Sequence, residues 1–328
     1  MRIAILMAGM ALTAGMTMAG AGASAQTTLR LACPSAADTP TCQAAQHFAD
    51  EVQNRTDGDV TVNVHPAGQL GTGRDAIVGM QTGSIDLVVE ELVNYSDFVT
   101  DYGILGWGFA FVDRAHLEQF LTSDIHAEMR AELADQNIEL LAYEWQRLPR
   151  AVVSSTPIFT VEDLGGLRFR VPEIRTFIAT WENLGANPQS VPWGEAYLAL
   201  RQGTVDAMES PFDTIAGQGF HEAAPYVSLT NHVQSVLSLA MNKGRYDGLD
   251  ADQQAAFEAA VESTNAFIAD RVQELHQETI DTITADGAYV IHLNTEAFAD
   301  RLAETGEQLA EEGLWSPGLL QEIRDLRN

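Results

Sequence analysis

The longest helical pattern in the sequence covers residues 251–285. This segment contains neither proline nor glycine, and apolar residues such as Phe257, Val261, Ile268 and Leu275 recur in it at helical spacing. A helix of about 35 residues is roughly 50 Å long. Because a single small domain is shorter than this, we expect the helix to lie across two lobes.

The sequence before this helix alternates between strand and helix patterns. Strands are expected at residues 28–32, 60–64, 85–89, 138–143, 167–171, 189–191, 207–209 and 236–241. Helices are expected at residues 43–55, 74–82, 115–136, 176–184 and 194–202, and an amphipathic stretch at 296–311. This βα alternation is typical of parallel sheets covered by helices. The sequence therefore predicts an α/β fold with two lobes and a ligand cleft between them, at the carboxyl ends of the strands.

The two lobes are each expected to use more than one stretch of the chain. We assign residues 26–147 plus 236–275 to lobe I, and residues 148–235 plus 276–328 to lobe II. No Gly/Ser-rich linker separates them, so the chain is expected to cross between the lobes more than once.

Residues 1–25 have the pattern of an export signal. Arg2 precedes an apolar stretch, and Ala23-Ser24-Ala25 matches an A-x-A cleavage site. A transmembrane anchor is the alternative, but the stretch is short and rich in glycine and alanine. We therefore expect a signal peptide and a periplasmic mature protein.

Only two cysteines occur, Cys33 and Cys42, nine positions apart. Export brings a protein into oxidising conditions, in which a disulfide between them is expected. Two buried free thiols are the alternative. A zinc site is a poor fit, because no histidine lies at ligand spacing from the pair.

Acidic residues greatly outnumber basic ones, 46 against 18. Segment 1–25 carries one basic residue, Arg2, and no acid, which leaves 17 basic and 46 acidic residues and a net charge of −29. Nucleic acids and anionic membrane surfaces are thereby excluded as general partners.

The sequence lacks the motifs of the common enzyme classes. Its histidines form no H-E-x-x-H pair, and neither G-x-S-x-G nor G-x-G-x-x-G occurs. We therefore predict that the protein is not an enzyme and uses no cofactor and no metal. A periplasmic hydrolase is kept as an alternative.

The scarce positive charge gathers in one region, where five arginines lie within 29 residues. Arg170 stands between Phe169 and Val171 at the end of an apolar strand, directly before Pro172, which cannot continue a central strand. Its side chain is expected to project into the cleft, where a guanidinium can bind a carboxylate with two parallel hydrogen bonds. Surface positions that balance acids are expected for three others, Arg147, Arg168 and Arg175.

Three segments resemble one known family. They are GLRFRVP (166–172), NLGANPQSVPWGEAYLALRQGTVDAMESP (183–211) and PAGQLGTGRDAIVGMQTGSIDLVVEE (66–91). These segments are similar to the solute-binding (DctP-like) subunits of tripartite ATP-independent periplasmic (TRAP) transporters, and the resemblance runs in order from about residue 27 to 325. It implies a two-lobed periplasmic binding protein with a long helix spanning both lobes. It also implies a monomeric receptor that captures a small organic acid and delivers it to TRAP membrane subunits for ion-gradient-driven uptake.

The resemblance also assigns roles to individual residues. Arg170 matches the arginine that pairs with the ligand's carboxylate, and Arg150 matches a second arginine that supports it. Trp193 occupies an aromatic position that packs against the ligand.

Three further positions line up with polar residues of the family's site. Glu209 and Ser210 match a Glu–Asn pair, so that a hydroxyl replaces an amide. Glu91 matches an acidic position facing the cleft, which would accept hydrogen bonds from ligand hydroxyls or an amine, and the adjacent Glu90 is the alternative for this position. The loop after the first strand departs from the family, because it contains Cys33.

Two questions stay open from the sequence. The ligand could be a sugar acid, an aromatic acid, a keto acid or a zwitterion. The binding protein could also serve a sensor or an ATP-driven importer instead of a TRAP transporter.

Overall fold

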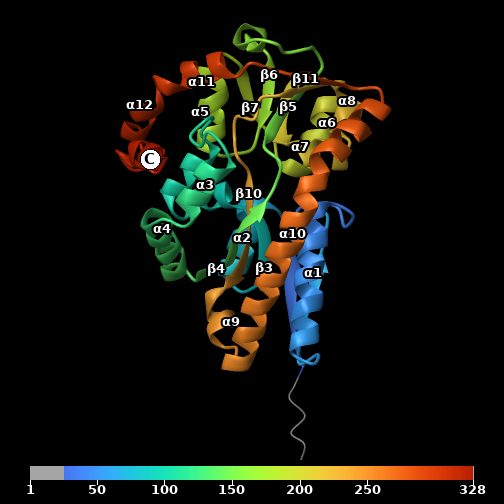
Figure 1. The fold of residues 1–328 in the computed structure, drawn as a ribbon, viewed down its shortest axis with the longest axis vertical. Coiled ribbons are helices and arrows are strands. Elements are labelled where there is room, and N and C mark those ends of the chain that lie inside the picture. The colour runs from blue at the N-terminus through green and yellow to red at the C-terminus, as the bar shows by residue number, and fades with distance from the viewer. Residues whose placement is uncertain (1–25, 328) are drawn as a thin grey trace, which may run out of the picture.

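The computed structural model describes residues 26–327, which form two sheets and the helices packed on them (Figure 1). The predicted signal peptide lies outside the described residues. The first sheet has the strand order β2 (Val60–His65), β1 (Thr27–Ala32), β3 (Leu87–Glu91), β10 (Val236–Asn242) and β4 (Ile138–Gln146). The second has the order β11 (Tyr289–His292), β9 (Tyr226–Leu229), β5 (Arg150–Ser154), β8 (Ala207–Pro211), β6 (Arg168–Val171) and β7 (Asn187–Ser190).

The helices follow the same division. The α-helices of the first part of the chain are α1 (Pro40–Arg55), α2 (Gly73–Gln81), α3 (Arg114–Leu121) and α4 (Asp124–Asp135). The central part has α5 (Arg175–Asn183), α6 (Ala196–Arg201), α7 (Phe212–Gly217), α8 (Phe220–Ala223) and α9 (Lys243–Asp247). The last part has α10 (Ala251–Ala285), α11 (Glu296–Ala303), α12 (Gly306–Glu311) and α13 (Leu319–Asp325). Short 3-10 helices are η1 (Leu92–Asp97), η2 (Thr100–Gly106), η3 (Val161–Leu164) and η4 (Trp193–Glu195).

Both sheets are mixed, which corrects the prediction of parallel sheets. In the first sheet β10 runs antiparallel to β3 and β4, and in the second β5 runs antiparallel to β8 and β9. The reason is the chain path, because β4 leads directly into β5 and β9 leads into β10. A strand that arrives from the other sheet starts beside the last residues of β3 or β8. It therefore runs antiparallel to that strand.

The long helix α10 is confirmed over the predicted residues, Ala251–Ala285. It starts with a capping box in which Asp250 and Gln253 satisfy each other's backbone N–H groups. Near its start, Phe257 packs edge-on against Phe48 of α1 in the core beside the first sheet. Near its end, Ile283 belongs to the core beside the second sheet. The helix therefore spans both cores (Figure 1).

Two predicted helices are each broken in the structure. The pattern at 115–136 is divided into α3 and α4, because Ser123 accepts a hydrogen bond from the His126 backbone and caps a new helix. The stretch at 296–311 is divided into α11 and α12. Ser123 is a strong N-cap residue, so its local hydrogen bond competes with helix continuation.

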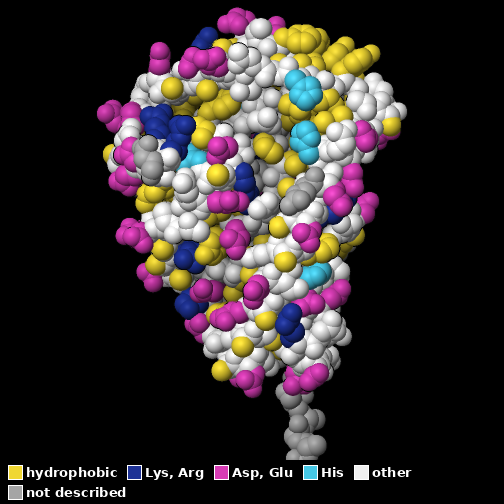
Figure 2. Space-filling view, viewed as in Figure 1, with side chains coloured by type: hydrophobic (Ala, Val, Ile, Leu, Met, Phe, Trp, Pro, Cys, Tyr) yellow, Lys and Arg dark blue, Asp and Glu magenta, His cyan; other side chains and the backbone are white. Residues whose placement is uncertain are grey.

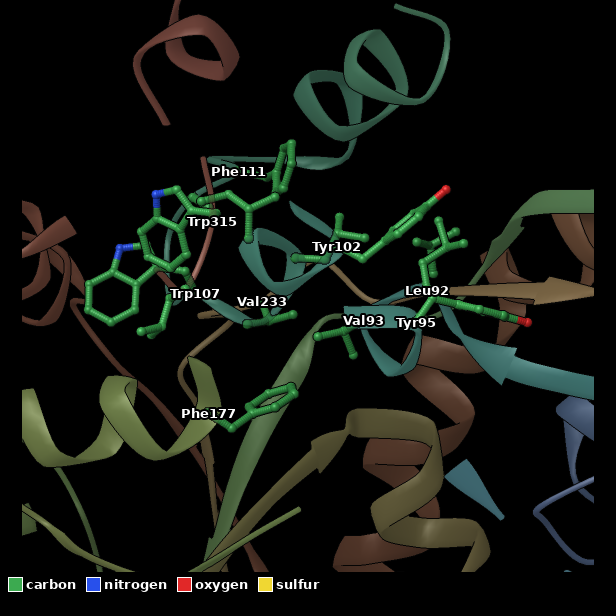
Figure 3. Packing of buried hydrophobic residues seen from close by; sticks show 14 of the residues in the cluster. Leu92, Val93, Tyr95, Tyr102, Trp107, Phe111, Phe177, Val233 and Trp315 are labelled. Carbon is green, nitrogen blue, oxygen red and sulfur yellow. The ribbon is translucent and has the colours of Figure 1, made fainter. Parts of the chain in front are cut away.

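A third core joins the two sheets through aromatic residues (Figure 3). Trp107, just after η2, packs against Trp315 with ring centroids 5.8 Å apart. Phe177 of α5 belongs to the same cluster. Nε2 of His116 lies 2.7 Å from the Ile323 carbonyl of α13. The C-terminal helices thus contact η2 and α3 as well as α5, and the assignment of residues to the two lobes stays a prediction.

The surface carries the acidic excess. Acidic side chains are spread over the face shown in Figure 2, and basic ones are few. Within residues 26–327, every helix is either too short or too polar to cross a lipid bilayer.

The predicted disulfide is confirmed. It joins Cys33, just after β1, to Cys42 in α1, with the two Cα atoms 6.0 Å apart. Pro34 and Ser35, which follow Cys33, line the main cavity of the molecule. The bridge therefore ties a cavity-lining loop to the first helix.

Replacing both cysteines with serine should lower the free energy of unfolding by about 2–3 kcal/mol, because the unfolded chain regains the entropy of a short loop. Urea denaturation of the wild type and the double variant measures the difference. Reduced wild type is the control and should match the variant. Equal stability of oxidised wild type and variant would contradict a stabilising bridge.

Candidate functional site

A cavity of ≈ 410 Å³ lies between the two sheets and is lined by residues at the ends of strands from both. Strand β3 contributes Glu90 and Glu91, and β6 and β8 contribute Arg170 and Ser210. The cavity is also lined by Asn94 and Trp193, which follow β3 and β7 in the chain. This is the position expected for a ligand site in open α/β sheets.

Arg170 is a buried cation without an acidic partner among the described residues. Its exposed fraction is 2%, and its Nε donates to the Val191 carbonyl at 2.9 Å. Its two terminal nitrogens make no hydrogen bond to a described residue. Burial lowers the pKa of Arg170 to about 10, with Glu209 acting in the opposite direction, so the side chain remains charged at neutral pH. The guanidinium carbon lies 5.7 Å from the centre of the Trp193 ring.

Arg150, in contrast, is shared by two carboxylates. Its Nη2 donates to Oε1 of Glu209 at 2.8 Å and its Nε to the other oxygen, while Nη1 donates to Glu91 at 2.7 Å. Burial acts to lower the pKa of Arg150, but Glu209 and Glu91 outweigh it and raise the pKa. Burial acts to raise the pKa of Glu209, but Arg150 and the nearby His232 together outweigh it and lower that pKa to about 2.

The structure corrects the interpretation that Arg147 lies on the surface. Its side chain is only 8% exposed, and its Nη1 donates to Glu91 at 2.6 Å. Its Nη2 donates to Thr214 and lies 3.5 Å from Asp213. The cause is its position between β4 and β5, where the chain passes the cavity. The sequence signal is R-x-x-R directly after an apolar strand, with Arg150 as its second arginine.

The other two arginines are surface residues, as predicted. Arg168 is half exposed and pairs with Asp206 at 2.6 Å. Arg175 does not balance an acid in this structure. Its terminal nitrogens donate to the carbonyls of Gly313 and Glu312 at 3.4 and 3.3 Å.

Two adjacent acids end β3 and face the cavity. Glu91 bridges the guanidinium groups of Arg147 and Arg150 and is 16% exposed at its side chain. Glu90 is more deeply buried and accepts hydrogen bonds from the Gly73 backbone at 2.6 Å and from Asn94 at 2.7 Å. Burial raises the pKa of Glu90 to about 7. Sequence reasoning gave Glu90 only as the alternative to Glu91, whereas both line the cavity, and it did not assign Asn94 to the site.

The remaining predicted residues differ in their access to the cavity. Ser210 is fully buried, lines the cavity and has no hydrogen-bond partner for its hydroxyl among the described residues. Trp193 lines the cavity from η4, with its ring 5.4 Å from that of Phe220. Glu209 does not line the cavity and lies behind Arg150.

Replacing Glu209 with Gln should lower the free energy of unfolding by about 3 kcal/mol near neutral pH. This is the lower end for breaking a buried ion pair, because Glu91 still faces Arg150. The pKa of Glu209 falls from 4.5 to about 2 on folding, so its stabilising effect is complete above about pH 4.5 and is lost as the pH falls toward 2.

Denaturant unfolding of wild type and variant at several pH values should therefore show a difference that narrows below about pH 4.5. Glu278→Gln, which breaks an exposed pair with Arg271, is the matched control and should change little. A difference that stays constant down to about pH 2.5 would count against the ionised Glu209.

Comparisons with known proteins agree with this architecture. The model of the DctP family, described as bacterial extracellular solute-binding protein, family 7, matches residues 32–312. The 2,3-diketo-L-gulonate-binding periplasmic protein of Escherichia coli (strain K12) is 32% identical over 261 residues, covering 79% of each chain. The C4-dicarboxylate-binding periplasmic protein of Rhodobacter capsulatus is 25% identical and covers 84% of this chain and 84% of the relative.

Solved structures share the fold. A TRAP periplasmic solute-binding protein from Ochrobacterium anthropi with bound L-fuconate superposes with a TM-score of 0.86 at 26% identity, covering 93% of this chain and 100% of the other. The two-sheet architecture, the cavity between the sheets and the family match over most of the chain point to one conclusion. This chain belongs to the DctP family of TRAP periplasmic solute-binding proteins, which bind their solutes without catalysis.

Proposed function

We propose that the protein captures a small organic acid, with the acid's carboxylate on Arg170. The observation that carries this proposal is the unpaired, buried guanidinium at the cavity wall. A buried charge without a partner is costly, and a carboxylate bound to its two terminal nitrogens would remove that cost. The ligand would thus supply the ion pair that the protein itself leaves incomplete.

Two neighbouring groups, Ser210 and Arg150, support the same binding mode. The Ser210 hydroxyl lacks a partner and can donate to the carboxylate or to a ligand hydroxyl. Arg150 has five N–H donors, of which its contacts with Glu209, Glu91 and Ser235 use four. The remaining N–H, on Nη2, is the one by which Arg150 would support the bound carboxylate.

The body of the ligand would lie between Trp193 and the acids of β3. A ring such as that of Trp193 covers an apolar or sugar face and excludes water. Glu91 and Asn94 can hydrogen-bond ligand hydroxyls. The cavity of ≈ 410 Å³ suits a molecule of sugar-acid size. The E. coli relative is named for binding 2,3-diketo-L-gulonate, and the O. anthropi structure contains bound L-fuconate. We propose a sugar acid for this chain as well.

Capture would be followed by delivery. We propose that residues 26–147 plus 236–275 and residues 148–235 plus 276–328 act as two lobes that close over the ligand. The crossing segments between β4 and β5 and between β9 and β10 would serve as hinges. The closed protein would then dock on the TRAP membrane subunits that the family implies, where an ion gradient drives uptake.

Replacing Arg170 with Ala should weaken acid binding by about 100-fold or more, because it removes one partner of a buried charge pair. The ligand is first found by a thermal-shift screen of sugar acids and other organic acids against their uncharged amides. Calorimetric titration then compares the affinities of wild type and variant for that acid.

Arg168→Ala is the matched control, since it removes an exposed arginine from the same strand, and its affinity should stay unchanged. Unchanged affinity in Arg170→Ala, or stabilisation by the amides alone, would refute the arginine clamp.

A further inference from the structure

We propose that the site selects acids with a single negative charge and rejects the matching dicarboxylates. This inference rests on the proposed capture of an acid by Arg170. It goes further by stating the ligand's charge, which neither the cavity's size nor the arginine clamp determines. The argument depends on which charges inside the cavity are already neutralised by the protein.

The cavity is lined by four arginines, and three of them have acidic partners within the chain. At the rim, the exposed Arg74 pairs with Asp97 at 2.9 Å. Deeper in the cavity, Arg147 pairs with Glu91 at 2.6 Å. Arg150 pairs with Glu91 at 2.7 Å and with both oxygens of Glu209.

The deep part of the cavity therefore has a small net charge. Arg147, Arg150 and Arg170 carry three positive charges, and the carboxylates that face them, those of Glu91, Glu209 and Asp213, carry three negative ones. Of these three arginines, Arg170 alone has no acidic partner among the described residues. Glu90 adds no positive charge and at most a further negative one. One ligand carboxylate on Arg170 gives this group one excess negative charge, and a second carboxylate would double that excess.

The positions of Glu90 and Glu91 determine where a second carboxylate of the ligand would be destabilised. Glu90 and Glu91 are consecutive at the end of β3, on the first sheet, whereas Arg170 ends β6 on the second. A ligand that reaches across the cavity from Arg170 meets these acids with its other end. Hydroxyl groups there can donate to the carboxylates, but a carboxylate would face like charges in a poorly solvated place.

Glu91 is the residue on which this selection depends. Its carboxylate occupies the N–H groups of Arg147 and Arg150 that a second ligand carboxylate would need. Replacing it with Gln keeps the size of the side chain and removes the charge. The variant should leave Arg147 with only its longer ion pair to Asp213, at 3.5 Å, and so accept the dicarboxylates that the wild type rejects.

The test uses acid pairs with the same carbon skeleton and one or two carboxylates. Suitable pairs are galactonate with galactarate, gluconate with glucarate, and 2-hydroxybutyrate with malate. Calorimetric titration of the exported protein gives the affinity ratio for each pair. We expect the wild type to bind the monoacid of one pair at least about 100-fold more tightly than its diacid, and Glu91→Gln to reduce that ratio at least about tenfold.

A matched control removes the same charge elsewhere. Glu262 is exposed on α10, and Glu262→Gln should leave the ratio as in the wild type. A diacid that binds the wild type as tightly as its monoacid would overturn the inference and leave the arginine clamp intact. An unchanged ratio in Glu91→Gln would also overturn it. Failure of every acid to bind would instead refute the proposed function, and the inference with it.

Discussion

The contact on which the site depends is the shared salt bridge between Arg150, Glu209 and Glu91. Glu209 belongs to β8 of the second sheet and Glu91 to the end of β3 of the first, so this one guanidinium holds the two sheets together at the point where the chain crosses. Because the three charges satisfy each other, the protein can keep them buried. Their compensation also leaves Arg170 as the arginine of the deep cavity without an acidic partner in the described part of the chain.

Much of the fold follows from local sequence patterns. The helix Ala251–Ala285 lacks any residue that would break it, and its extent was predictable to the residue. Strand direction was not, because β10 and β5 look like any apolar strand, and their antiparallel direction is set by the crossing of the chain. The break at Ser123 was also missed, since a capping serine is compatible with a longer amphipathic pattern until its hydrogen bond is seen.

The kinds of residue in the site were predictable from the sequence. The ion-pair partners of these residues were harder to predict. Arg170 could be placed from its position at a strand end before Pro172, and the structure shows it at the cavity. The partners of an arginine are harder to predict, because they come from other strands, as with Arg150 and Glu209, 59 positions apart. Arg147 was misjudged for this reason, since nothing near it in the sequence reveals the contact with Glu91.

The continuous helix α10 has a mechanical consequence. Val272, near its middle, packs against the core beside each sheet. A rotation of either sheet and its core would therefore act on this one helix. A helix without proline or glycine bends only gently. The proposed closure of the cavity would therefore be accommodated by a small curvature or sliding of this helix. The outer face of α10 would then change shape when the proposed closure occurs, at a distance from the ligand itself.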